Sequence, residues 1–165
     1  MAGDGVVHEQ QPGHREEPYP RRMAVAINVT IDCREPERLA QFWRALLGYV
    51  DRPVPAGYAS WEEHDRAAGV PESDLDAGSA AEDPEGRGPR LFFQRVPEPK
   101  TTKNRVHLDV DVSAGARTPA AVAAKVQAEA ARAEELGAII VRTNDDDKDY
   151  FVVLVDPEGN EFCLT

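Results

Sequence analysis

The stretch that decides the fold is the last of the chain, FVVLVDPEGNEFCLT, residues 151–165. Its five apolar residues from Phe151 to Val155 predict a buried strand, and residues 161–164 predict a strand that returns beside it. The segment DPEGN between them predicts a tight turn, because Pro157 fixes φ and Gly159 can adopt a positive φ. We therefore expect the chain to end in a hairpin.

Two earlier segments alternate apolar and polar residues, which is typical of strands with one face on a core. In AVAINVTIDC, residues 24–33, the polar face carries Asn28. In NRVHLDVDV, residues 104–112, the polar face carries His107 and Asp109. We expect these polar faces to point toward solvent or a cavity.

Each of these strands is followed by a predicted helix that ends in Leu-Gly. The first helix lies in EPERLAQFWRALLG, residues 35–48, with Pro36 in its first turn, and Phe42 and Trp43 are expected in the core. The second helix begins after Thr118 as N-cap and runs to Gly137. Three strands should follow each helix. In the first half they are YVDRPV (49–54), GYASWEEH (57–64) and RLFFQRV (90–96), with a long loop over residues 65–89, and in the second half they are AIIVRTN (138–144) and the final hairpin.

The simplest description is an internal repeat of two βαβββ modules, residues 23–97 and 105–165. A linker of residues 98–104 joins them, and a polar tail of residues 1–22, which we expect to be disordered, precedes them. The predicted fold class is α+β, with mixed curved sheets. A helix covers one face of each sheet, so the two uncovered faces are expected to form a concave cleft.

Composition and charge exclude several classes of partner. The net charge of −11 argues against nucleic acid or an anionic membrane surface, since binding either needs clustered Lys and Arg. The apolar runs are too short to span a bilayer, and the N-terminus lacks the apolar core of a secretory signal. The chain has two cysteines, 130 positions apart, which argues against a disulfide framework. We therefore expect a cytoplasmic protein. Residues 62–87 carry nine acids against Arg66 and Arg87, which suits either a solvated loop or a rim that attracts cations.

Four segments in this order make the chain resemble the vicinal oxygen chelate (VOC) superfamily, the glyoxalase and bleomycin-resistance group. They are INVTIDCREPERLAQFW, LFFQRVPEPK, VHLDVDV and FVVLVDPEGNEFCL. The resemblance implies paired βαβββ modules, a concave sheet and often a homodimer. Metal-binding members place ligands at positions that correspond here to Asn28, Gln94, His107 and Cys163.

These four residues form a poor ligand set for a divalent ion. Zinc and non-haem iron take His, Cys or carboxylate ligands, and the amides of Asn28 and Gln94 carry no charge. We therefore expect no metal cofactor, with one divalent ion as the alternative, for which Asp109 can supply the missing carboxylate. Without a metal, Asn28, Gln94 and His107 would form a polar floor with Asp109 and Cys163 beside it. The expected aromatic walls are Tyr58, Trp61, Phe92 and Tyr150. The alternative for each polar residue is ordinary burial with satisfied hydrogen bonds and no ligand, and the meeting of three such residues in one cleft favours the binding site.

Two functions remain open from the sequence. In the first, the protein is a binding module for a small polar guest, and Asp32, Asp109, Asp111 and the acidic loop favour a cationic or amine-bearing one. In the second, it is a metal-dependent enzyme of the lyase, isomerase or dioxygenase type. His107 is the candidate general base, with Asp109 as its nearest partner on the strand. The expected partners are the small molecule and a second copy of the chain.

Overall fold

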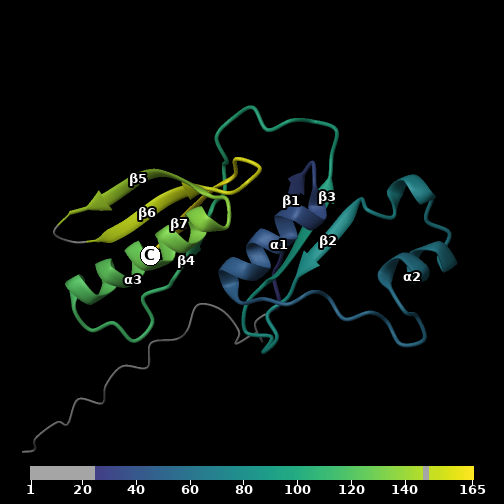
Figure 1. Ribbon diagram of the computed structural model, residues 1–165, viewed down its shortest axis with the longest axis horizontal. Helices are drawn as coiled ribbons and strands as arrows, with labels where there is room; N and C mark the ends of the chain where they lie inside the picture. The colour runs from purple at the N-terminus through teal and green to yellow at the C-terminus, as the bar shows by residue number, and fades with distance from the viewer. Residues whose placement is uncertain (1–24, 147–148) are drawn as a thin grey trace, which may run out of the picture.

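The computed structural model describes residues 25–146 and 149–165, so the predicted tail over residues 1–22 lies outside the described residues. Two mixed sheets lie side by side, and each carries one long helix on the same side (Figure 1). The first sheet has the strand order β1-β3-β2 and the second β4-β7-β6-β5. The elements of the first half are β1 (Asn28–Cys33), α1 (Pro36–Leu47), α2 (Trp61–Ala67), the short 3-10 helix η1 (Glu72–Asp74), β2 (Gly78–Ala81) and β3 (Arg90–Arg95). Those of the second half are β4 (Leu108–Val110), α3 (Pro119–Glu135), β5 (Ile139–Asp145), β6 (Tyr150–Val155) and β7 (Glu161–Leu164).

The second half has the predicted βαβββ order. The hairpin of β6 and β7 is antiparallel, with Val152 opposite Leu164, and its turn is closed by a bond from the Asp156 amide to the Asn160 carbonyl at 2.9 Å. Gly159 has φ of 85°, which is the conformation that the turn required of it. Thr118 caps α3 as expected, because its hydroxyl accepts a bond from the Ala121 amide.

The first half departs from the prediction between α1 and β3. The predicted strands over residues 49–54 and 57–64 are wrong: Val50 forms one isolated bridge with Glu82, and α2 begins at Trp61. The reason is a local capping arrangement. The Ser60 hydroxyl accepts a bond from the Glu63 amide, and the Glu63 carboxylate accepts one from the Ala59 amide, so the segment closes as a helical turn.

Residues 65–89 were expected to be a loop, yet they contain the end of α2, η1 and strand β2. Strand β2 consists of GSAA and pairs antiparallel with β3. Its small residues make room for an aromatic neighbour, since a Cβ on Gly78 would lie 2.8 Å from the ring of Phe92. Sequence alternation cannot detect such a strand, because none of its residues is large and apolar.

Both period-two strands are shorter than predicted. The side chains of Val25 and Ile27 are 85% and 71% exposed, and that of Val106 is 79% exposed. These residues continue the apolar alternation beyond the sheets, where β1 and β4 have not yet begun. The alternation therefore identifies which side chains of each strand face the core. It also extends the predicted strands beyond the part of the sheet that the helices cover.

A single hydrophobic core includes residues from both halves. The rings of Phe42 and Trp43 on α1 contact the ring of Phe162 on β7, with centroids 6.0 and 5.1 Å apart. Each such aromatic pair contributes about 1 kcal/mol beyond its buried area. Helix α1 of the first module thus packs against the second module through these rings, and this packing contributes to how the sheets approach each other.

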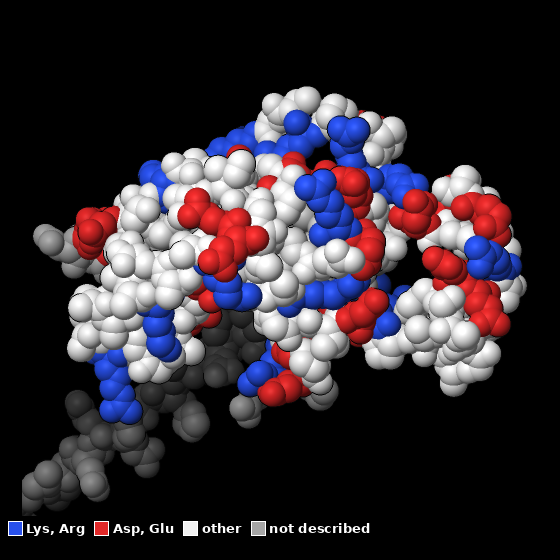
Figure 2. All heavy atoms as spheres, viewed as in Figure 1, with Lys and Arg blue, Asp and Glu red and all other residues white. Residues whose placement is uncertain are grey.

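Helix α2 lies on a segment, residues 51–77, that projects beyond the first sheet and that we call the arm (Figure 1). None of its side chains is buried, and Figure 2 shows carboxylates gathered over the arm with basic side chains between them. Among the described residues, no helix is both long enough and apolar enough to cross a bilayer.

Candidate ligand site between the two modules

A groove of about 270 Å³ lies between strand β1 of the first module and the segment that leads into β4 of the second. One wall comes from β1 and includes Thr30 and Asp32, and the other includes Asn104 and His107. The remaining lining residues are Val29, Ile31, Trp43, Val106, Leu108, Asn160, Glu161 and Phe162. We name this hollow the inter-module groove.

His107 joins the groove to a cluster of polar side chains on the second sheet. Its Nδ1 lies 3.1 Å from a carboxylate oxygen of Asp109 and 3.9 Å from Sγ of Cys163. The parallel register of β4 and β7 places Asp109 opposite Cys163, so their side chains share the face of the sheet away from α3. One donor atom from each of these three residues lies within 4.8 Å of the others.

The members of this cluster differ in their access to solvent. The side chains of His107 and Asp109 are 42% and 61% exposed, whereas Cys163 is buried at 8%. Burial, together with the adjacent Asp109 carboxylate, raises the pKa of the Cys163 thiol. The cysteine is therefore held as a neutral thiol, which disfavours a role as nucleophile.

Two carboxylates line the groove, and their surroundings differ. Glu161 accepts a bond from the Asn104 amide at 3.0 Å and pairs with Lys100 at 3.1 Å. The backbone bond and the ammonium group lower the pKa of Glu161 to about 2, so it stays ionised while its charge is offset. Asp32 lies exposed on β1, between the groove and the open face of the first sheet. It is the carboxylate better placed to meet a cationic group.

Asn28 and Gln94 do not line the inter-module groove with His107. Both lie on the open face of the first sheet, but Asn28 is paired with Arg90 and Gln94 with Asp32. Four strand residues separate these positions, which is about 13 Å. The structure therefore brings His107, Asp109 and Cys163 together, whereas the two amides are apart from each other and outside the lining of the groove.

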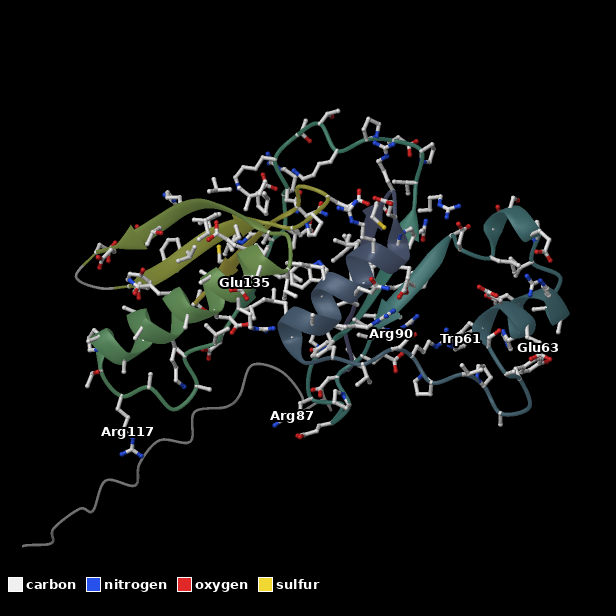
Figure 3. All side chains as sticks on the ribbon, in the orientation of Figure 1. Trp61, Glu63, Arg87, Arg90, Arg117 and Glu135 are labelled. Carbon is white, nitrogen blue, oxygen red and sulfur yellow. The ribbon has the colours of Figure 1, made fainter. Side chains whose placement is uncertain are left out.

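The aromatic residues expected as walls are also dispersed. Trp61 lies on α2, where its ring stacks under the Arg52 guanidinium at 3.9 Å and its indole N–H donates to the Arg52 carbonyl. Figure 3 shows Trp61 on the far side of the first sheet from β4. Tyr58 belongs to the same arm, with its ring against that of His64. Phe92 covers Gly78 on the first sheet.

Tyr150 lies on the helix-covered face of the second sheet, not on the open one. Its hydroxyl accepts a bond from Gln127 of α3 at 2.8 Å. It lines a different, larger hollow of about 740 Å³ between the start of α3, the end of β5 and the start of β6. The spacing along the strand explains this placement. Tyr150 lies two and four residues before the buried Val152 and Leu154, so all three side chains point to the same face of the sheet.

Several groove residues were not predicted as site residues, namely Thr30, Asn104, Asn160 and Glu161. Thr30 shares the polar face of β1 with Asn28 and Asp32, so the alternation contained this signal. Asn104, Asn160 and Glu161 come from the linker and the final turn, and only the tertiary packing brings them to β1. Cys33 and Cys163 are both free and buried, on separate sheets.

Comparison with known proteins supports the architecture. A solved hypothetical protein, SA1046 from S. aureus, matches with a TM-score of 0.54 and 15% identity over 87% of this chain and 97% of that one. A glyoxalase/bleomycin resistance protein/dioxygenase family enzyme from Burkholderia phytofirmans matches with a TM-score of 0.54 and 17% identity, over 83% and 94%. At these identities the similarity shows the fold alone. Among curated proteins, none matches the sequence.

The fosfomycin resistance protein FosX from Listeria monocytogenes, solved with Mn(II) and dihydroxypropylphosphonic acid, is also similar. The TM-score is 0.56 with 9% identity, over 87% of this chain and 90% of that one. The family model described as glyoxalase-like domain matches residues 28–165, which is nearly all of the part that the structure describes. The chain therefore belongs to the glyoxalase-like domain family, within the VOC superfamily.

Proposed function

We propose that this protein binds a small polar molecule carrying an amine in the inter-module groove, and that it does so without a metal ion. The observation that carries the proposal is the meeting of Asp32 from the first module with His107 from the second in one hollow. A volume of about 270 Å³ suits a small guest and not a drug-sized one. Both modules have to be folded against each other for this site to exist.

The groove offers groups that complement an ammonium and its neighbours. Asp32 supplies a negative charge that no ion pair of the described residues offsets, and Thr30 and Asn104 can donate or accept hydrogen bonds. His107 is oriented by Asp109, which accepts from Nδ1 when that atom is protonated, so the other ring nitrogen is left as acceptor for a guest. The apolar side chains of Val29 and Val106 would contact the hydrocarbon part of the guest.

The test is a titration of the full chain, labelled with ¹⁵N, with a four-carbon diamine and with the four-carbon diol of the same length. We expect the diamine to shift the amides of the groove and the diol to leave them unchanged, because only the diamine carries charge. Asp32→Asn should weaken diamine binding by about twofold to fivefold, the scale of an exposed ion pair. Asp74→Asn, on the arm, removes the same charge outside the groove and should leave binding unchanged.

Equal binding of the diol, or an unchanged affinity in Asp32→Asn, would remove the basis for an amine-bearing guest.

A second candidate function is a metal-dependent enzyme of the lyase, isomerase or dioxygenase type. One observation favours it: His107, Asp109 and Cys163 form a compact set of three strong donors, in which Asp109 supplies the carboxylate that the four family positions lack. Imidazole, carboxylate and thiolate together suit zinc better than manganese or magnesium. These three residues would hold the ion, which would polarise vicinal oxygens of a substrate. FosX was solved with Mn(II), but it shares 9% identity with this chain.

Metal analysis of the purified chain and a zinc titration separate the two candidates. The metal-free proposal predicts less than one ion per chain and no zinc-dependent rise in melting temperature. Stoichiometric zinc that is lost in Cys163→Ala, but retained in Cys33→Ala, would replace the first function with the second. Cys33 is the matched control because it is also buried but lies in the first sheet.

A further inference from the structure

Helix α1 of the first module is held along its length by groups of the second module. At its start, the Glu158 carboxylate accepts bonds from the backbone amides of Arg34 and Glu35 at 2.8 to 3.1 Å. At its end, the Arg132 guanidinium of α3 donates to the carbonyls of Ala45 and Leu46 at 2.9 and 2.7 Å. Both contacts cross from one module to the other.

Between these ends, the carboxylate of Asp156 contacts the middle of the helix. Asp156 is 2% exposed, and its Oδ2 accepts bonds from the indole N–H of Trp43 at 3.3 Å and from the side-chain amide of Asn160 at 3.0 Å. Its Oδ1 accepts from the backbone amides of Glu158 and Asn160, each at 2.9 Å. Every one of these neighbours is a donor, so the site is built for a carboxylate.

Two of these donors lead directly to the groove. Trp43 lines it from the first module and Asn160 lines it from the second. The Asp156 carboxylate itself is not a lining residue; it lies behind both walls and bonds to each. A displacement of this carboxylate would therefore move the two walls relative to each other.

We propose that Asp156 is a positioning residue that sets the width of the inter-module groove by holding Trp43 and Asn160 on one carboxylate. The selectivity of the groove is then controlled by a residue that no guest touches. The effect of Asp156 on the binding of a guest rests on the proposed function, whereas its effect on the spacing of the two walls does not. Asparagine at this position would turn an amide donor toward groups that are already donors, and this would force the walls apart.

The first test needs no guest. Backbone amide shifts are measured in the full chain for Asp156→Asn, with Glu135→Gln, an exposed acid on α3 (Figure 3), as the control for charge removal. We expect shifts to reach Thr30 and Asp32 on β1 and, on the wall opposite β1, Asn104 and His107; none of these residues bonds to Asp156. Shifts confined to the turn of residues 156–160 and to α1 would overturn the proposal, because a purely local structural role predicts that result.

Trp43→Phe is the second variant, since it keeps an aromatic ring and removes the N–H that donates to Asp156, together with part of the buried ring volume. It should shift the same amides of the opposite wall in the same direction and by less, and it carries the test if Asp156→Asn does not fold. An unchanged opposite wall in Trp43→Phe would likewise overturn the proposal.

A further measurement repeats the diamine titration on these variants. If Asp156 positions the walls, its replacement weakens diamine binding by about threefold to thirtyfold, which is the range for residues that affect a binding site without contacting its ligand. Unaltered diamine affinity in both variants would contradict the link to selectivity. If the unmodified chain itself fails to bind the diamine, the proposed function fails, while the amide shifts still decide the role of Asp156.

Discussion

At the scale of single residues, the cluster of His107, Asp109 and Cys163 shows how the charge of one side chain influences the protonation state of another. The Asp109 carboxylate lies on the same face as the thiol and favours its neutral form, and burial acts in the same direction. A bound divalent ion would reverse this preference, because a coordinating thiol is deprotonated. The protonation state of Cys163 therefore reports on whether the cluster holds a ligand, a metal or neither.

The thiol provides a first prediction. Asp109→Asn removes the negative charge beside Cys163, so the pKa of this thiol should fall and alkylation by iodoacetamide should become faster at neutral pH. The rate is followed for the peptide that contains Cys163 by mass spectrometry over a range of pH, which separates it from Cys33. Asp111→Asn is the control, since Asp111 bonds to Ser113 and is not a cause of the raised pKa. A pH profile identical in the two variants would contradict the assigned cause.

At the scale of elements, the linker before β4 is attached to β7 through Glu161. The carboxylate accepts from the Asn104 amide and pairs with Lys100, and these contacts place the linker along one wall of the groove. Hydrogen bonds to an ionised group contribute more than neutral ones, although partial exposure reduces the gain to about 1 kcal/mol here. The position of the linker thus depends on the charge of Glu161.

This dependence gives a second prediction with a defined pH range. The pKa of Glu161 is lowered to about 2, so its stabilising contribution is present above the pKa of the unfolded chain and is lost as pH falls toward 2. Glu161→Gln should lower the free energy of unfolding at pH 7 by about 1 kcal/mol and by less at pH 2. Urea unfolding at both values measures the difference. An equal loss at the two pH values would show that charge is not the cause.

The arm also supports a prediction at this scale. Ser60→Ala removes the N-cap of α2 and should destabilise that helix by about 1 kcal/mol. Because α2 buries no side chain, the global unfolding free energy should stay nearly unchanged. Hydrogen exchange is expected to become faster in residues 61–67 alone. Faster exchange throughout the first sheet would mean that the arm supports the core.

At the scale of the whole molecule, the two modules depend on each other for burial. Trp43 is 1% exposed and contacts Phe162 of the other module, so Trp43→Ala should cost about 3 to 5 kcal/mol and expose Phe162. Thermal unfolding of this variant should remain a single transition with a lower midpoint, because one core unfolds. Two separate transitions would instead indicate modules that fold independently. The predicted module boundaries are compatible with either result.

The homodimer stays a prediction at this scale. Strands β1 and β4 are both edge strands, and the exposed Val25, Ile27 and Val106 lie next to them. Burial of these side chains against a second copy would remove apolar surface from water. Sedimentation equilibrium should give twice the mass of one chain, and Ile27→Asp should shift it toward the mass of one. A single-chain mass for the unmodified protein would exclude the dimer.

What the sequence by itself determined was local. The final hairpin, the N-cap at Thr118 and the stop at Gly48, with φ of 68°, depend on neighbouring residues, and the structure confirms them. The helix of the arm was equally local, since Ser60 and Glu63 form its capping arrangement, but two short strands were predicted in its place. Strand β2 was missed because its small residues carry no periodic signal.

Only the tertiary structure decided the site. Alternation shows which face of a strand a residue occupies, and it placed Asn28, His107 and Asp109 on the open faces. It does not show how two sheets approach each other, because that depends on the packing of Trp43 against Phe162 and on the bonds that Asp156 and Glu158 make to α1. These contacts bring β1 to the linker and the final turn, so Asp32 and Asn160 share the groove with His107, while Asn28 and Gln94 lie elsewhere on the first sheet.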